Sequence, residues 1–479
     1  MALYSYLFGL LVACVSYIVY QKYVNVYTSI IIKPQKRYDY IIVSTHCKSC
    51  LLFQAILLPS NIFSLGSSIY PLFLTVGAGT AGCVLASRLS EDPNTKVLLV
   101  EAGDHMGYFT KIPLTPTAAQ QGPDDWSVRT KPQKYSSFGL WGQSQFIPRG
   151  KGLGGSGQIN FLLHGTGLPG DYGRWAQLGF KGWTFKDLKP YFIKAFGTVR
   201  SEFDSGHCAI DGDCPAAKVP MKLKQIDDDN ELMNAFRLAS MHSTRNIFRR
   251  PTATIKDGAR HSTLNAYLKP ALGRKNLHVL LRTQAVSIRF INMTASSLYI
   301  LQNHRELDNI FVNKEIIVAA GAIKSPQLLM LSGIGPPELL RRLKIKLVLP
   351  NKEVGRNFHD HMNMPLYVSI QRPIRPLSFP PLSGVEYQNS SAVMLFSMGT
   401  ASERLLRDLS NYKPQVFRDT FPFYNNTNKE GFMFLSTCVQ PRSRGTITLA
   451  DSTTSMPPVV DPNYLEQYFD VKCMVKGKY

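Results

Sequence analysis

A glycine-rich turn between two apolar segments is the feature that most constrains this chain. LFLTVGAGTAGCVLASRLSEDPNTKVLLVEAGD, residues 72–104, places Gly77, Gly79 and Gly82 between an apolar strand and a helical stretch, and a second strand then ends in Glu101. This order is typical of the βαβ unit of a dinucleotide-binding fold. The glycines let the backbone approach a pyrophosphate at a helix N-terminus, and Glu101 is placed to bind a ribose diol. The unit alone does not separate FAD from NAD.

Two further segments predict additional close contacts with a large ligand. IPRGKGLGGSGQINFLLHG, residues 147–165, has too many glycines around Ser156 and Asn160 for the interior of a helix or strand. Such a loop lets the backbone lie flat against a planar ligand. EIIVAAGAIKSPQLLMLSGIGP, residues 315–336, reads as a strand, a small-residue turn containing Gly321, and a helix. It predicts a second helix N-terminus beside the same ligand.

These motifs resemble the signatures of the glucose-methanol-choline (GMC) family of FAD-dependent alcohol oxidoreductases. DYGRWAQLG, ARHSTLNAYL, VGRNFHDH, SRGTITLAD and DPNYL fit the same pattern, which runs from residue 37 almost to the end and is closest to the insect glucose dehydrogenase-like branch. The resemblance implies an α/β fold, with a Rossmann-like FAD-binding domain and a substrate domain containing a mainly antiparallel sheet. It implies FAD as cofactor, an alcohol or sugar such as glucose as substrate, hydride transfer from the CH–OH group to flavin N5, and a quinone or another electron acceptor. An NAD-dependent dehydrogenase would have no use for the second and third motifs.

The resemblance assigns cofactor contacts by position and divides the chain into discontinuous segments. A chain of 479 residues is in any case too long for one compact core. The implied contacts are Gly77, Gly79 and Gly82 with the phosphates, Glu101 with the adenosine ribose, Arg149, Ser156 and Asn160 with the pyrophosphate and flavin, Val286 with the adenine through its backbone, and Gly321 at the second close approach. The expected segments are a hydrophobic signal or anchor at 1–36, FAD-binding parts at 37–165 and 259–355, and substrate parts at 166–258 and 356–479, the last truncated. Two departures are Gly157, where a second serine is usual, and the segment HGTGLPGD, which lacks the usual arginine before its glycine.

The catalytic base is the part of the family pattern that this sequence lacks. The family places a catalytic histidine late in the chain, whereas the last of the ten histidines here is His361. His359 and His361 lie in VGRNFHDH, which in the family is an ordered structural turn, so no catalytic residue is assigned. General-base help typically contributes about a hundredfold to ten-thousandfold in rate. We therefore expect little or no alcohol oxidation even with FAD; the alternative is a non-catalytic, secreted or membrane-tethered flavin-binding relative.

A strand lead-in occurs twice before the first glycine turn. RYDYIIV, residues 37–43, has the expected form, yet Gly77 follows only after the 33 residues from Ser44 to Val76. Removing these residues would restore RYDYIIVGAGTAGC. Val43-Ser44 can be encoded by a splice-donor-like sequence and Thr75-Val76 by an acceptor-like one, so we expect a translated intron. The alternative is a true insertion, in which YPLFLTV supplies the strand.

The N-terminal segment indicates the secretory pathway. Residues 2–20 carry no charge and are long enough to span a bilayer as a helix, although a cleaved signal peptide is an open alternative. Asn292, Asn389 and Asn425 head glycosylation sequons, which suit a secreted or membrane-anchored glycoprotein.

Charge and cysteine content exclude some classes of partner. The net charge of +21 is mostly dispersed and does not interleave with aromatic residues, so we expect no nucleic-acid partner. Cys208 and Cys214 either form a loop disulfide or are unrelated thiols. Cys47 and Cys50 form a C-x-x-C pair, but no second pair stands at metal-site spacing, so no metal is expected.

Overall fold

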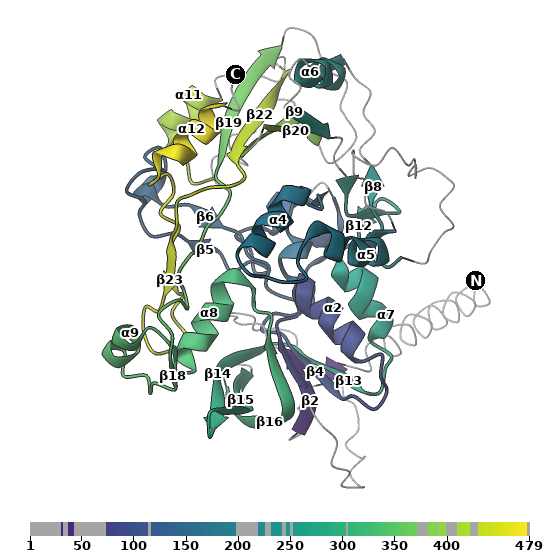
Figure 1. The fold of residues 1–479 in the computed structure, drawn as a ribbon, viewed down its shortest axis with the longest axis vertical. Helices are drawn as coiled ribbons and strands as arrows, with labels where there is room; N and C mark the ends of the chain where they lie inside the picture. The colour runs from purple at the N-terminus through teal and green to yellow at the C-terminus, as the bar shows by residue number, and fades with distance from the viewer. Residues whose placement is uncertain are drawn as a thin grey trace, which may run out of the picture.

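The chain folds around two large sheets at opposite ends of the molecule (Figure 1). The structure is a computed structural model that describes residues 30–31, 37–42, 73–113, 116–197, 219–225, 231–241, 246–249, 252–302, 305–370, 382–388, 390–398, 410–421 and 430–476. The predicted anchor at 2–20, both C-x-x-C cysteines, Cys208, Cys214, Asn389 and Asn425 lie outside these residues.

The larger sheet has eight strands and positions the glycine turn. Its order is β1-β13-β4-β2-β16-β15-β14, and β3 pairs with both β4 and β16. In this sheet order, neighbouring strands from β1 to β16 pair in parallel. The pairs β16–β15 and β15–β14 are antiparallel. The bounds are β1 (Ile30–Ile31), β2 (Arg37–Ile42), β3 (Phe73–Val76), β4 (Val97–Val100), β13 (Leu277–Leu280), β14 (Thr283–Ile291), β15 (Thr294–Gln302) and β16 (Arg305–Val318).

Both faces of this sheet are covered, which explains the unbroken apolar sequence of β4. Val97 and Leu99 pack toward α2 (Thr80–Leu89) and the π-helical turn at Leu264–Leu268, whereas Leu98 and Val100 pack with residues of β14, β15 and α8. A strand buried on both faces needs apolar residues at successive positions rather than at alternate ones. Helix α7 (Lys269–Ala271) packs on the same side as α2, α8 (Gly321–Leu331) packs on the opposite side, and α9 (Pro337–Arg342) packs against Met330 of α8.

The second sheet has five strands and is antiparallel throughout. Its order is β19-β22-β21-β20-β9, with bounds Asn363–Ile370, Glu430–Cys438, Ser391–Met398, Leu382–Gln388 and Asn246–Arg249. Figure 1 shows α4 (Pro169–Gln177) and α5 (Phe185–Phe196) between the two sheets. Helices α6 (Glu231–Met241), α11 (Pro414–Thr420) and α12 (Tyr468–Lys476) pack on this sheet. The predicted fold class, α/β with a second, mainly antiparallel sheet, is confirmed.

Short strands pair outside the two large sheets. They are β5 (Val128–Arg129) with β6 (Phe146–Ile147), β7 (Leu163–His164) and β8 (Lys224–Gln225) with β10 (Thr252–Ala253), β11 (Ile255–Lys256) with β12 (Ala259–Arg260), β17 (Ile334–Gly335) with β18 (Leu349–Pro350), and β23 (Thr446–Thr448) with β24 (Val459–Asp461).

A disulfide that the sequence did not indicate fastens α12 to the antiparallel sheet. Cys438, at the end of β22, is bonded to Cys473 of α12, with 5.4 Å between their Cα atoms, and both side chains are buried. The two cysteines lie 35 residues apart, so spacing alone gave no reason to pair them.

Strands β2 and β3 pair with the same residues of the large sheet. Tyr40 of β2 and Phe73 of β3 both pair with Val97 of β4 and with Glu315 of β16. Since each edge of β4 and β16 can accept only one strand at a given register, only one of the two lead-ins can be hydrogen-bonded there at a time.

No helix in the described part of the chain is both long enough and apolar enough to span a bilayer.

Candidate cofactor site

The first glycine turn joins β3 to α2 and leaves the helix N-terminus open. Gly77 has a φ of 107°, a left-handed conformation that favours glycine. Gly79 is the N-cap of α2, and neither a capping side chain nor an acidic side chain occupies the first turn. The free N–H groups of this turn therefore remain available to an anion such as phosphate.

The second glycine loop lies directly against this turn. The Gly154 N–H donates to the Ala78 carbonyl at 2.8 Å, and a Cβ on Gly155 would lie 2.6 Å from the Gly79 Cα. Gly155 also has a φ of 54°. Only glycine can make this contact, so the glycine-rich composition of both segments follows from their mutual approach. Ser156 continues the loop, and its Oγ accepts from the Gly150 N–H at 3.1 Å.

Glu101 stands at the end of β4 beside this contact and is fully buried. Its two carboxylate oxygens accept the N–H groups of Ala78, at 3.0 Å, and Gly103, at 2.9 Å. The carboxylate thus ties the glycine turn to the following loop. A carboxylate oxygen can accept more than one hydrogen bond, which is the chemistry that recognition of ribose hydroxyls needs. Its negative charge also contributes, after burial itself, to raising the pKa of the neighbouring Cys83 thiol to about 12.

Asn160 and Val286 each present polar groups that the protein leaves available. The Asn160 side chain is exposed, and its carbonyl oxygen accepts from Arg260 and from the Leu162 N–H. Its amide N–H groups are directed to no acceptor within the described residues. Val286 lies at a β-bulge of β14, between the paired residues Ala285 and Ser287. A bulge leaves backbone polar groups outside the ladder, where an adenine could meet them.

Arg260 organises the second loop, a role that the sequence alone did not indicate. It is only 3% exposed, and it donates to the carbonyls of Thr110, Gly157 and Asn160 as well as to the Asn160 side chain. Burial lowers its pKa to about 10. ARHSTLNAYL contains this arginine, so the family motif carried the signal without showing its role.

Gly321 begins α8 at a second helix N-terminus on the same edge of the sheet. Its φ is 80°, and the Arg149 guanidinium lies 3.9 Å from the place a Cβ on Gly321 would take. Burial lowers the Arg149 pKa, against the opposing effects of Asp360 and Asp125. The Ala319 N–H donates to the Val76 carbonyl, so the turns that lead into α2 and α8 begin side by side. Ligands of open α/β sheets bind at this edge, outside the carboxyl ends of the strands.

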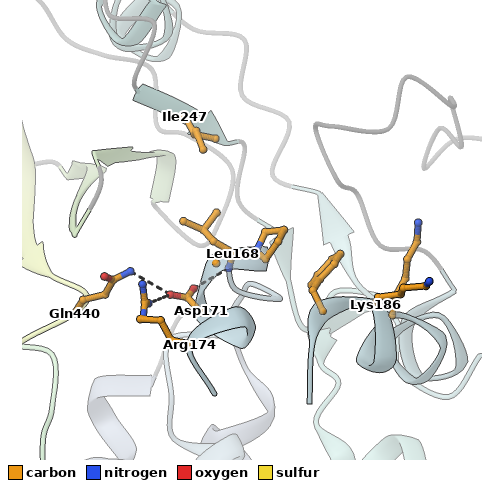
Figure 2. A pocket seen from close by; sticks show the side chains of 10 residues that line it. Leu168, Asp171, Arg174, Lys186, Ile247 and Gln440 are labelled. Atoms are coloured by element: carbon orange, nitrogen blue, oxygen red, sulfur yellow. Dashed lines mark hydrogen bonds and ion pairs between the residues drawn. The ribbon is translucent and has the colours of Figure 1, made fainter. Parts of the chain in front are cut away.

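A separate cavity of about 680 Å³ lies between α4, α5 and β9 (Figure 2). In Figure 2 the polar contacts converge on Asp171, which accepts from Arg174, from the Gln440 amide at 3.2 Å and from the Leu168 N–H at 2.9 Å. Its lining includes none of the residues that the sequence assigns to the cofactor. We therefore do not assign this cavity to the cofactor.

The histidines of VGRNFHDH are held by backbone groups. The His359 Nδ1 lies 3.1 Å from the Asn357 carbonyl, and the His361 Nε2 lies 3.0 Å from the Val439 carbonyl. Between them, Asp360 accepts from the buried Tyr464 hydroxyl at 2.8 Å. These contacts are those of an ordered turn.

The two apposed glycine loops, the uncapped N-terminus of α2 and the buried Glu101 carboxylate are features typical of an α/β dinucleotide-binding fold. The sequence model of the family described as GMC oxidoreductase matches residues 72–363, which is more than half of the chain. The protein Neither inactivation nor afterpotential protein G of Drosophila melanogaster is 31% identical over 441 residues, covering 85% of this chain and 70% of that protein. Glucose dehydrogenase [FAD, quinone] of the same species is 30% identical over 436 residues, covering 85% and 68%. The chain belongs to the GMC oxidoreductase family.

Solved structures agree on the fold. Pyridoxine 4-oxidase from Mesorbium loti superposes with a TM-score of 0.69 at 23% identity, covering 84% of this chain and 77% of that one. Formate oxidase gives 0.68 at 19% identity, covering 92% and 80%. The cofactor of the family is FAD. The residues present fit it, because the Glu101 carboxylate, the glycine contact and the open N-terminus of α2 offer a ribose acceptor and a phosphate cradle.

Proposed function

We propose that this chain binds FAD for the oxidation of the CH–OH group of an alcohol or sugar and passes electrons to a quinone or a similar acceptor. The observation that carries this proposal is the buried Glu101 carboxylate, held between the glycine turn and the loop that follows β4. The relatives named above include a glucose dehydrogenase that uses FAD and quinone. Bound FAD supplies the hydride acceptor, and the residues of this chain orient it and hold its phosphates.

We further propose that none of the described histidines His164, His359 and His361 is the proton acceptor that alcohol oxidation requires. Losing a hydride and a proton turns an alcohol into a carbonyl, and the proton needs a positioned base. His359 and His361 both contact backbone carbonyls, and His164 packs on Phe196 with 4.4 Å between ring centroids. Burial also lowers the pKa of His164. These contacts support structural roles.

The test is anaerobic reduction of the FAD-loaded chain. We expect glucose and simple primary alcohols to leave the flavin absorbance unchanged over minutes, whereas dithionite bleaches it at once. Bleaching by an alcohol at the rate of an active family member would show that a base is present. Failure to retain flavin would instead contradict the cofactor-binding part of the proposal.

We also propose that the chain matures in the secretory pathway. The Cys438–Cys473 disulfide supports this, because stable disulfides are rare in reducing compartments. Asn292 is exposed at the turn between β14 and β15, where an oligosaccharide would meet no packed surface. When the protein is expressed in secreting cells, Asn292→Gln should lower its mass by one oligosaccharide that a glycosidase can remove. Asn276 does not head a sequon, so Asn276→Gln is the control and should leave the mass of attached sugar unchanged. An unchanged mass would place Asn292 outside the glycosylated set.

A further inference from the structure

Two buried lysines meet over one tryptophan at the N-terminal end of α8. Lys324, in the first turns of α8, is 7% exposed, and Lys151, in the second glycine loop, is 9% exposed. The Lys324 Nζ lies 4.3 Å from the centroid of the Trp126 ring, and the Lys151 Nζ lies 5.7 Å from the same centroid. Neither ammonium group has a hydrogen bond or an ion pair within the described residues.

A third cation, the Arg149 guanidinium, reaches the same helix end, 3.9 Å from the Cβ position of Gly321. The two carboxylates whose charges act on the Arg149 guanidinium, Asp125 and Asp360, already accept hydrogen bonds from other groups. Asp125 accepts the N–H groups of Gln121, Ser127 and Arg149 itself, and Asp360 accepts the hydroxyl of Tyr464. Among the described residues, positive charge therefore gathers here without a carboxylate dedicated to it.

This arrangement is unfavourable unless an anion completes it. Burial, and then repulsion from Lys151, lower the pKa of Lys324 to about 8. A ring face compensates a buried ammonium only in part. The N-terminus of α8 adds a partial positive charge of its own at the same place. Two ammonium groups, a guanidinium and a helix N-terminus together form a site for a multiply charged oxyanion.

We propose that Lys324, Lys151 and Arg149 bind the diphosphate group of FAD and hold the cofactor against the N-terminus of α8. The turns into α2 and α8 begin side by side, since the Ala319 N–H donates to the Val76 carbonyl. The diphosphate then lies between the open N-terminus of α2 and the cations beside α8. The proposal rests on FAD as the cofactor and does not depend on whether the chain oxidises an alcohol.

The test compares Lys324→Met with Lys344→Met, which removes the same charge from an exposed position. Lys324→Met is expected to weaken FAD binding by about tenfold or more, because a charged hydrogen-bonding partner of the phosphates is lost. Riboflavin, which lacks the diphosphate, should bind the variant and the wild type equally. The melting temperature without FAD should rise, because a desolvated ammonium is removed. Lys344→Met should change none of these quantities.

The pH dependence gives a second readout. In the FAD-free protein Lys324 loses its proton above a pKa of about 8, and a bound anion raises that pKa. FAD affinity should therefore fall as the pH rises above 8, by up to about tenfold per pH unit until the pKa of the bound state is reached. Lys324→Met should lack this dependence. Wild-type FAD affinity in Lys324→Met, or an equal loss for riboflavin, would overturn the proposal and leave Lys324 a packing residue of Trp126.

Discussion

Glu101→Ala is expected to abolish measurable FAD binding and to lower the free energy of unfolding by about 2–6 kcal/mol. The stability loss follows from leaving two buried N–H groups, those of Ala78 and Gly103, without an acceptor, at about 1–3 kcal/mol each. The binding loss follows because the ribose hydroxyls lose their acceptor at the same position. Flavin fluorescence titration and urea unfolding of the FAD-free protein measure the two effects separately.

Two variants separate the role of the Glu101 charge from its role in folding. Glu101→Gln keeps one oxygen acceptor, so it should cost less stability than alanine yet still weaken FAD binding. Glu91→Ala removes an exposed carboxylate that, among the described residues, forms an ion pair with Arg88, and it should change stability by no more than about 1 kcal/mol. If Glu101→Ala bound FAD with wild-type affinity, the carboxylate would be a purely structural tie between β4 and the glycine turn.

Backbone requirements explain what the sequence could predict. Gly155 has a positive φ and lies against the Gly79 Cα. Both requirements exclude residues with a side chain, so the sequence shows them as conspicuous glycines. The apolar run of β4 likewise follows from a strand buried on both faces. The α/β class, the second antiparallel sheet and the family could therefore be predicted from the sequence. The segment boundaries and the role of each cofactor residue stay predictions.

Contacts between distant side chains explain what the sequence could not predict. Arg260 reaches Thr110 across 150 positions, and Cys438 bonds Cys473 on a helix whose orientation is set by packing. Lys324 looked like one polar residue in a helix, and only folding brings it to Trp126. The identity of a single residue does not predict such contacts, because they depend on how distant segments pack in the folded protein.

The repeated lead-in yields the other prediction with a large effect. We expect Ile41→Pro alone and Leu74→Pro alone to be tolerated, whereas the double variant should not fold. Ile41 of β2 and Leu74 of β3, 33 positions apart, pair with the same residues, Leu98 of β4 and Ile316 of β16. This offset equals the length of the segment that the sequence marked as an insertion. Proline in a central strand removes a ladder hydrogen bond and is excluded there.

The redundancy arises because either strand can complete the sheet. When one lead-in carries proline, the other can pair with β4 and β16 in the same register, so the sheet keeps its hydrogen bonds. The double variant leaves the position between these strands empty and exposes two strand edges that are otherwise buried. Circular dichroism of the four proteins and urea unfolding of the wild type and the two single variants test this. Each single variant should keep a cooperative unfolding transition, whereas the double variant should lack the folded signal, a loss that the sum of the two single effects does not account for.

Deletion of residues 44–76 sharpens the test, because it leaves β2 as the single lead-in and joins it directly to Gly77. The shortened chain should fold and bind FAD at least as well as the full chain, because β2 supplies the strand and fewer residues lose conformational entropy on folding. In that background Ile41→Pro should become as damaging as the double variant. If Leu74→Pro alone unfolds the full chain, β3 is the required strand, the segment is a true insertion, and β2 does not replace it.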